Sequence, residues 1–117
     1  MWILILALII ADQISKHFLT TVTNTGAAFG ILKNFNVPLL IFSLIALVIC
    51  IYFYFKNKKI RLPLIFLISG IIGNSTDRIL FGHVRDFINV GFFPVFNLAD
   101  SFNFIGIVLL IILLWKR

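Results

Sequence analysis

The chain has no glutamate and few charged residues of any kind. Of its 117 residues only 12% are charged, while 62% are hydrophobic and the mean hydropathy is +1.14. An average soluble domain has roughly 25% charged residues. This scarcity of charge excludes an ordinary soluble protein and indicates an integral membrane protein. The length allows about four helices of roughly 20 residues, so we expect residues 1–117 to form a single domain.

Several common catalytic and structural motifs are also missing. The only cysteine, Cys50, lies in an apolar run and cannot form an internal disulfide. His17 and His83 have no metal-ligand spacing around them, and the sequence contains neither an H-E-x-x-H motif nor a phosphate-binding loop. Serine, cysteine and zinc peptidases therefore lack their essential parts here. We expect no metal and no cofactor.

The positive charge of the chain is concentrated between apolar runs. The formal net charge is +6, and four of the ten cations lie in the segment Lys56–Arg61. In a membrane protein such a loop is typical of the cytoplasmic side, so it does not predict a nucleic-acid partner. The terminal Lys116–Arg117 pair has the same preference. Both termini are therefore predicted to lie in the cytoplasm.

Four continuous apolar runs predict four transmembrane helices. Their approximate limits are Met1–Thr20, Phe35–Phe55, Leu62–Phe81 and Phe96–Trp115. A closed β-barrel would need alternating strands of about ten residues instead. The predicted fold is an all-α membrane protein, a four-helix transmembrane bundle. The connections at 21–34 and 82–94 then lie outside the cell.

All four acidic residues are aspartates that lie within or beside the apolar runs. Ionised carboxylates at membrane depth cost roughly 2.5–3.5 kcal/mol on insertion scales, so each indicates a function or a charged partner. Asp12 and Lys16 are spaced i, i+4, which favours an ion pair that supports the first helix. Asp86 and Asp100 both fall at the predicted outer face. Two carboxylates in an apolar pocket do not ionise together cheaply, and such a pair can activate water.

Polar side chains also occupy the outer part of the third run and its neighbours. Asn74, Asp77 and Arg78 share one helix face, so an amide, an acid and a guanidinium can form one network. The guanidinium of Arg78 suits a peptide carbonyl or a carboxylate. Asn97 is placed to cap the fourth helix, with Asp100 in its first turn.

Together these motifs resemble the type II, or lipoprotein, signal peptidases, which are four-helix aspartyl peptidases of the bacterial inner membrane. The resemblance spans nearly the whole chain and rests on five motifs in order: Asp12-x-x-x-Lys16, Asn24-Thr-Gly-Ala-Ala-Phe29, Gly73-Asn74-x-x-Asp77-Arg78, Val84-x-Asp86-Phe87 and Phe96-Asn97-x-Ala99-Asp100. Two connections are shorter than in typical members: the link from the first helix to Asn24, and the loop between Asp86 and Asp100. In the family they form an extracellular β-sheet cradle and a substrate-covering loop, so a reduced cradle is implied.

The resemblance implies cleavage of diacylglyceryl-modified prolipoproteins just before the lipidated cysteine. It implies an active site at the outer face, contact with membrane lipid, inhibition by globomycin-type cyclic peptides, and action as a monomer. Asp86 and Asp100 would form the catalytic dyad. Substrate-binding roles would fall to Asn24, Gly26, Asn74, Arg78 and Asn97. Supporting roles would fall to Asp12, Lys16 and Asp77.

Two other functions are compatible with parts of the pattern. A small proton-coupled transporter would use Asp12 as a midplane site and Arg78 for an anionic substrate. However, transporters of this kind have internal repeats, and no repeat is visible in the sequence. A catalytically silent assembly protein would leave Asp86 and Asp100 as loop and cap residues. Substitution of either aspartate would then have no effect on activity.

Overall fold

The computed structural model describes residues 2–19, 21–26 and 34–116. Each apolar run forms a helix whose ends lie within two residues of the predicted limits, because the runs are long, continuous and bounded by polar or turn residues. In chain order the elements are α1 (Trp2–Phe18), β1 (Val22–Asn24), α2 (Asn36–Lys56), the 3₁₀ turn η2 (Lys58–Ile60), α3 (Arg61–Phe81), β2 (Val84–Asp86) and α4 (Leu98–Trp115).

Three of these helical segments are long and apolar enough to cross a membrane. They are Asn36–Lys56, Lys58–Phe81 (which joins η2 to α3) and Leu98–Trp115. Helix α1 has 17 residues, about 26 Å at 1.5 Å per residue, and contains Asp12 and Lys16 in its C-terminal half. The chain is therefore a mostly helical, multi-pass membrane protein.

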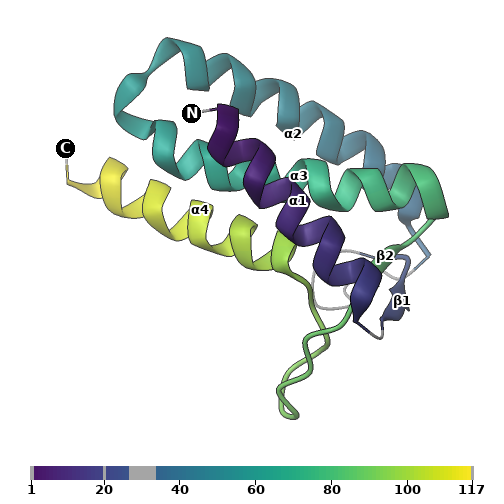
Figure 1. Ribbon diagram of the computed structural model, residues 1–117. Helices are drawn as coiled ribbons and strands as arrows, with labels where there is room; N and C mark the ends of the chain where they lie inside the picture. Colours follow the sequence, from purple (N-terminus) through teal and green to yellow (C-terminus); the bar gives the residue numbers. More distant parts are fainter. Residues whose placement is uncertain (1, 20, 27–33, 117) are drawn as a thin grey trace.

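Helix α3 lies at the centre of the bundle, with α2, α4 and α1 packed around it (Figure 1). Its side chains Leu64, Ile65 and Ile68 form the apolar core together with Ile5 and Tyr54. Glycines allow α3 and α4 to pack closely. A Cβ atom on Gly70 would lie 2.5 Å from the Ala99 carbonyl oxygen, and one on Gly106 would lie 2.8 Å from the Pro63 carbonyl oxygen. Small residues are typical of helix contacts in membranes.

Both ends of the described chain lie at the same end of the bundle (Figure 1). The ring of Trp2 contacts the rings of Tyr54 and Phe55, which directly precede the basic segment Lys56–Arg61. The first residues of α1 are thereby fixed beside the turn between α2 and α3. At this end Arg61 donates a hydrogen bond from Nε to the Tyr54 carbonyl, at 2.8 Å.

The opposite end of the bundle carries a small antiparallel sheet of β1 and β2. Val22 pairs with Asp86, Thr23 with Arg85, and Asn24 with Val84. This sheet and an isolated antiparallel bridge between Ile88 and Phe96 are the β structure among the described residues, and the sheet agrees with the reduced cradle implied by the resemblance. The segment Ala27–Phe29 of the Asn24 motif lies outside the described residues.

Candidate active site

Asp86 and Asp100 are brought together at the sheet end of the bundle. Asp86 is the last residue of β2, and Asp100 lies in the first turn of α4. Both are buried, with exposed fractions of 3% and 4%. They lie 14 positions apart in the sequence, and the short connection between them turns back on itself so that its two ends meet.

Asn97 connects the two acids directly. Its side-chain Nδ2 donates to Asp86 Oδ1 at 2.8 Å, and its Oδ1 accepts from the Asp100 backbone N–H, also at 2.8 Å. In return Asp100 Oδ2 accepts from the Asn97 backbone N–H at 3.2 Å, which completes a capping box. The predicted cap is therefore present. Because Asn97 also donates to Asp86, the residue that caps α4 also fixes the position of Asp86 relative to Asp100.

Asn74 of α3 forms a second connection between the acids. Its Nδ2 donates to Asp100 Oδ1 at 3.0 Å, and its Oδ1 accepts from Asn97 Nδ2 at 3.0 Å. Because Oδ1 also accepts from Lys16 Nζ at 3.2 Å, the amide orientation of Asn74 is fixed by cationic and amide donors. Asn74 can therefore only donate toward Asp100.

The short sheet supplies the remaining contact to Asp86. Asn24, at the end of β1, donates from Nδ2 to Asp86 Oδ2 at 3.0 Å. Its own Oδ1 accepts from the Gly26 backbone N–H at 2.8 Å, which stabilises the turn after the strand. Arg78 Nη2 donates to the Gly26 carbonyl, so Gly26 is held through its N–H by Asn24 and through its carbonyl by α3.

The pKa of Asp86 is raised from its ordinary value of 3.8 to about 6. Burial is the largest cause, and the negative charge of Asp100 acts in the same direction. The amides of Asn24 and Asn97 act in the opposite direction because they donate to the ionised carboxylate. Near neutral pH this carboxyl group is close to its titration range, as a group that exchanges protons during catalysis should be.

The raised pKa of Asp86 predicts a specific pH dependence of stability. The folded state favours the protonated carboxyl group, so this contribution is complete below about pH 4 and is lost as the pH rises through about 6. The difference between 3.8 and about 6 corresponds to about 3 kcal/mol. Asp86→Asn removes the titration. Its melting temperature, measured in detergent relative to the parent protein, should therefore rise between about pH 4 and about pH 7. A difference independent of pH would contradict the raised pKa.

Lys16, Asp12 and Asp77 form a buried ionic cluster directly behind the site. Lys16 Nζ lies 2.8 Å from Asp12 Oδ2 and 3.0 Å from Asp77 Oδ2, and all three side chains are inaccessible to solvent. Asp12 Oδ1 also accepts from the Ala99 backbone N–H at 2.9 Å. The cluster thus holds the first turn of α4, and Asp100 with it, against α1 and α3.

Arg85 and Gln13 contact this cluster and are not among the sequence-predicted site residues. Arg85 forms an ion pair with Asp77, with 2.9 Å between Nη2 and Oδ1, and donates from the same atom to Gln13 Oε1 at 2.8 Å. Gln13 Nε2 donates in turn to Asp77 Oδ1 at 3.1 Å. The only sequence signal for either residue is that each lies next to a motif aspartate, Asp86 or Asp12.

The structure connects every residue predicted for the site, but the connections differ in one respect from the sequence analysis. Asn74 and Asp77 meet through Lys16. Arg78 contacts the backbone of Gly26 and forms no hydrogen bond or ion pair with Asp77 within the described residues. The amide, acid and guanidinium expected to share one network are thus joined through intermediate residues and not by direct contacts along α3. The ion-pair partners of Asp77 are instead Lys16 of α1 and Arg85 of β2, at 3.0 Å and 2.9 Å. No metal-binding group of His, Cys or Asp side chains occurs in residues 2–19, 21–26 and 34–116.

Comparisons with known proteins show the family and the fold of the chain. Residues 4–116 match the family model described as signal peptidase (SPase) II. Relatives named lipoprotein signal peptidase include one from Halothermothrix orenii, 39% identical over 102 residues, which covers 85% of this chain and 70% of that protein. Another, from Streptococcus thermophilus (strain CNRZ 1066), is 36% identical over 138 residues, covering 97% of this chain and 90% of that protein. A third, from Staphylococcus aureus (strain Newman), is 40% identical over 114 residues, with coverages of 89% and 70%.

Two solved structures, both described as bacterial membrane enzyme structures obtained by the in meso method, have the same fold. The first superposes with a TM-score of 0.89 at 32% identity, covering 97% of this chain and 86% of that chain. The second has a TM-score of 0.84 at 31% identity, with coverages of 98% and 92%. The sequence match extends through both aspartates and every element that holds them, and we conclude that the chain belongs to the signal peptidase II family.

Proposed function

We propose that this protein is a membrane aspartyl endopeptidase that removes the signal peptide from diacylglyceryl-modified prolipoproteins, cleaving just before the lipidated cysteine. The observation that carries the proposal is the pair Asp86 and Asp100, buried at one end of the bundle and joined by the amides of Asn74 and Asn97. The family assignment supports the reaction class and leaves the transporter hypothesis without support. No cofactor is part of the proposal.

In the proposed mechanism the two carboxyl groups share one proton. The ionised member removes a proton from a water molecule, and the water oxygen attacks the scissile carbonyl carbon. The protonated member donates its proton to the carbonyl oxygen, which gives a neutral tetrahedral intermediate. When that intermediate collapses, the member that had protonated the carbonyl oxygen takes back a proton from a hydroxyl group, the C–N bond breaks, and the other member gives the proton it took from water to the leaving nitrogen. The pair therefore returns to its starting state, and the apparent pKa values belong to the pair.

The surrounding residues have separate roles in this proposal. Asn24, Asn74 and Asn97 hold the carboxylates and present amide groups to the substrate backbone. Gly26 leaves room for the substrate beside the dyad, and Arg78 fixes the turn that contains Gly26 by donating to its carbonyl. Asp12, Lys16 and Asp77 support α4 from behind.

The function can be tested by genetic complementation. In bacteria depleted of their own signal peptidase II, expression of this protein should restore mature lipoproteins and remove the accumulated diacylglyceryl-modified precursor. The two forms separate by size on immunoblots. The Asp86→Asn protein should be produced at the same level and leave the precursor unprocessed. Persistence of the precursor with well-produced parent protein would contradict the proposed function.

We further propose a membrane arrangement in which all four helices span the cytoplasmic (inner) membrane of a bacterium. Both termini and the Lys56–Arg61 segment would face the cytoplasm, and the sheet with the dyad would lie at the outer face. Supporting this, the first residues of α1 contact the end of α2 beside the basic segment. The chain would act as a single-domain monomer, with globomycin-type cyclic peptides as competing ligands.

Cysteine labelling tests this orientation. In a Cys50→Ser background, a membrane-impermeant maleimide should label Asn89→Cys in intact cells and Lys59→Cys only after the membrane is permeabilised. Both side chains are exposed and belong to opposite ends of the bundle. The reverse pattern would place the dyad on the wrong side for exported substrates and would contradict the proposed function.

Arg78→Lys should lower the turnover number about tenfold. Arginine directs planar N–H donors at the Gly26 carbonyl, whereas lysine offers one compact charge, so the turn that holds Asn24 against Asp86 should loosen. The matched control is Arg61→Lys, which changes an arginine that also donates to a backbone carbonyl but lies at the other end of α3. Turnover of lipidated substrate should stay at the parental rate in this control. A parental rate in Arg78→Lys would show that Arg78 contributes only its charge.

A further inference from the structure

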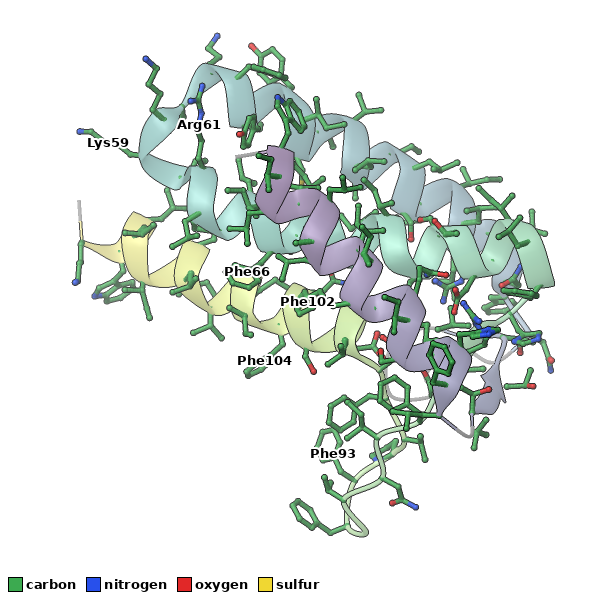
Figure 2. The ribbon with its side chains drawn as sticks, in the orientation of Figure 1. Lys59, Arg61, Phe66, Phe93, Phe102 and Phe104 are labelled. Carbon is green, nitrogen blue, oxygen red and sulfur yellow. The ribbon has the colours of Figure 1, made fainter. Side chains whose placement is uncertain are left out.

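The excess positive charge of the chain is confined to the end of the bundle opposite the sheet. The basic segment Lys56–Arg61 joins α2 to α3 there, and α4 ends on the same side (Figure 1). Figure 2 shows Lys59 and Arg61 at the opposite end of the bundle from Phe93. The four cations of the segment and the terminal Lys116–Arg117 pair equal the whole net charge of +6, and the other four cations match the four aspartates in number. An anion is therefore attracted to this end of the bundle.

The basic segment has no acidic partner within the part of the chain that the structure describes. The ion pairs found there all belong to Lys16 or Arg85, and all four aspartates are buried at or near the site. Lys56, Lys58 and Lys59 are exposed instead. Closely spaced like charges repel one another, so a bound anion would relieve this repulsion.

The segment also has a fixed shape. Asn57 Oδ1 accepts from the Lys59 backbone N–H at 3.1 Å and so caps the 3₁₀ turn η2. The guanidinium of Arg61 lies over the Tyr54 ring, with Cζ 4.9 Å from its centroid, and Nε donates to the Tyr54 carbonyl. Neither Nη group of Arg61 donates to a described residue. This fork is the part of arginine that binds phosphate in two-point contact.

Lys56 is held by an aromatic side chain in a similar way. Its Nζ donates to the Tyr52 hydroxyl oxygen at 3.0 Å and lies 5.4 Å from the ring centroid. The Tyr52 hydroxyl group can still donate its own proton. Cationic and hydroxyl donors are thus already ordered before a ligand arrives, which lowers the entropic cost of binding.

Exposed aromatic rings lie directly beside these cations. Trp2 is 54% exposed and contacts the rings of Tyr54 and Phe55, which precede the segment. Phe55 is 58% exposed. Tryptophan and tyrosine are preferred at the level of the lipid headgroups. A ligand at this place meets cations and apolar rings together, which favours a molecule with an anionic head and apolar chains over a soluble anion.

We propose that the basic segment binds the headgroup of an anionic phospholipid. Lys56, Lys59 and Arg61 hold the phosphate, and the acyl chains lie against Trp2 and Phe55. In the proposed membrane arrangement this lipid belongs to the inner leaflet. The lipid neutralises the segment and fixes the start of α1 to the turn between α2 and α3. This binding is separate from the dyad and does not depend on the peptidase function.

Tryptophan quenching by brominated phospholipid tests the proposal. A Trp115→Phe protein keeps Trp2 as its only tryptophan. In vesicles, brominated phosphatidylglycerol should quench Trp2 at a lower mole fraction than brominated phosphatidylcholine with the same acyl chains. Lys56→Gln/Lys59→Gln should weaken the relative binding of phosphatidylglycerol by about fivefold for each lysine removed. The matched control Lys56→Arg/Lys59→Arg keeps both charges and should bind like the parent. Both lysines are exposed, so all variants should fold.

Equal quenching by the two lipids in the parent, or an unchanged preference in Lys56→Gln/Lys59→Gln, would overturn the proposal. Either result would leave the proposed peptidase function intact, because no cleavage is measured. A further arm adds glycerol 3-phosphate, a soluble phosphate ester, in large excess over the brominated lipid. The quenching should persist. Its loss would show that the segment binds free phosphate esters, and the phospholipid proposal would be wrong.

Discussion

Replacing Lys16 with methionine should destabilise the protein by about 3–5 kcal/mol, the usual cost of breaking a buried ion pair by removing one partner. The ammonium group of Lys16 contacts Asp12, Asp77 and Asn74 and has no access to solvent. Methionine fills much of the same volume, so the effect would come from the uncompensated carboxylates rather than from a cavity. Because Asp12 also holds the Ala99 N–H, the first turn of α4 should loosen.

The melting temperature and the folded yield in detergent measure this effect. Lys59→Met is the matched control, because Lys59 is exposed in the basic turn and forms no ion pair within the described residues. Combining Lys16→Met with Asp12→Asn should cost less than the sum of the two single changes, because the second removes a charge left unpaired by the first. A Lys16→Met protein as stable as the Lys59→Met control would show that the cluster is neutral or already solvated.

Asp86→Asn and Asp100→Asn should each reduce cleavage by at least about a thousandfold while leaving a folded protein in the membrane. Asparagine keeps the size of the side chain and loses the proton exchange that the proposed mechanism needs. The double variant should be no worse than either single variant, because residues that act as a unit are not additive. Asp12→Asn, by contrast, should lower stability more than it lowers turnover, because Asp12 contacts the helix end and Lys16 rather than either dyad carboxylate.

Turnover of all four variants in the same lipid separates these roles. Each rate is normalised to the amount of folded protein, so that the lower yield expected of Asp12→Asn does not count as lost chemistry. Substantial activity in either single dyad variant would remove that aspartate from the mechanism. A silent assembly protein would show no difference between any variant and the parent.

The helices could be predicted from the sequence because each apolar run is long, continuous and bounded by polar residues. Their limits depend on where the hydropathy of neighbouring residues changes, which can be read directly along the sequence. The Asn97 cap is equally local, since its partner Asp100 is three positions away. The sheet is different. Strands of three residues carry too little pattern to be recognised, and β1 pairs with a strand about 60 positions away. Only the resemblance to a family with a cradle pointed to it.

The members of the site were also predictable, but their contacts were only partly so. Each predicted residue is a polar group that membrane burial makes costly unless it has a partner. The identity of that partner depends on how the helices pack. Arg85 and Gln13 are 72 positions apart and meet only because β2 lies beside α1. The guanidinium of Arg78 was expected to suit a peptide carbonyl or a carboxylate, and its partner is the Gly26 carbonyl, 52 positions away, which the sequence alone could not identify.

The most direct test of the dyad assignment is mass spectrometry of the products formed by the purified protein in lipid vesicles. A diacylglyceryl-modified prolipoprotein is the substrate, and the same precursor without its lipid is the control. We expect the parent protein to release the intact signal peptide and a mature chain that begins at the lipidated cysteine. The unlipidated precursor should remain uncut, and Asp86→Asn and Asp100→Asn should form neither product. Cleavage at another bond, or the same products from a folded Asp86→Asn or Asp100→Asn protein, would contradict the assignment of these two residues as the catalytic pair.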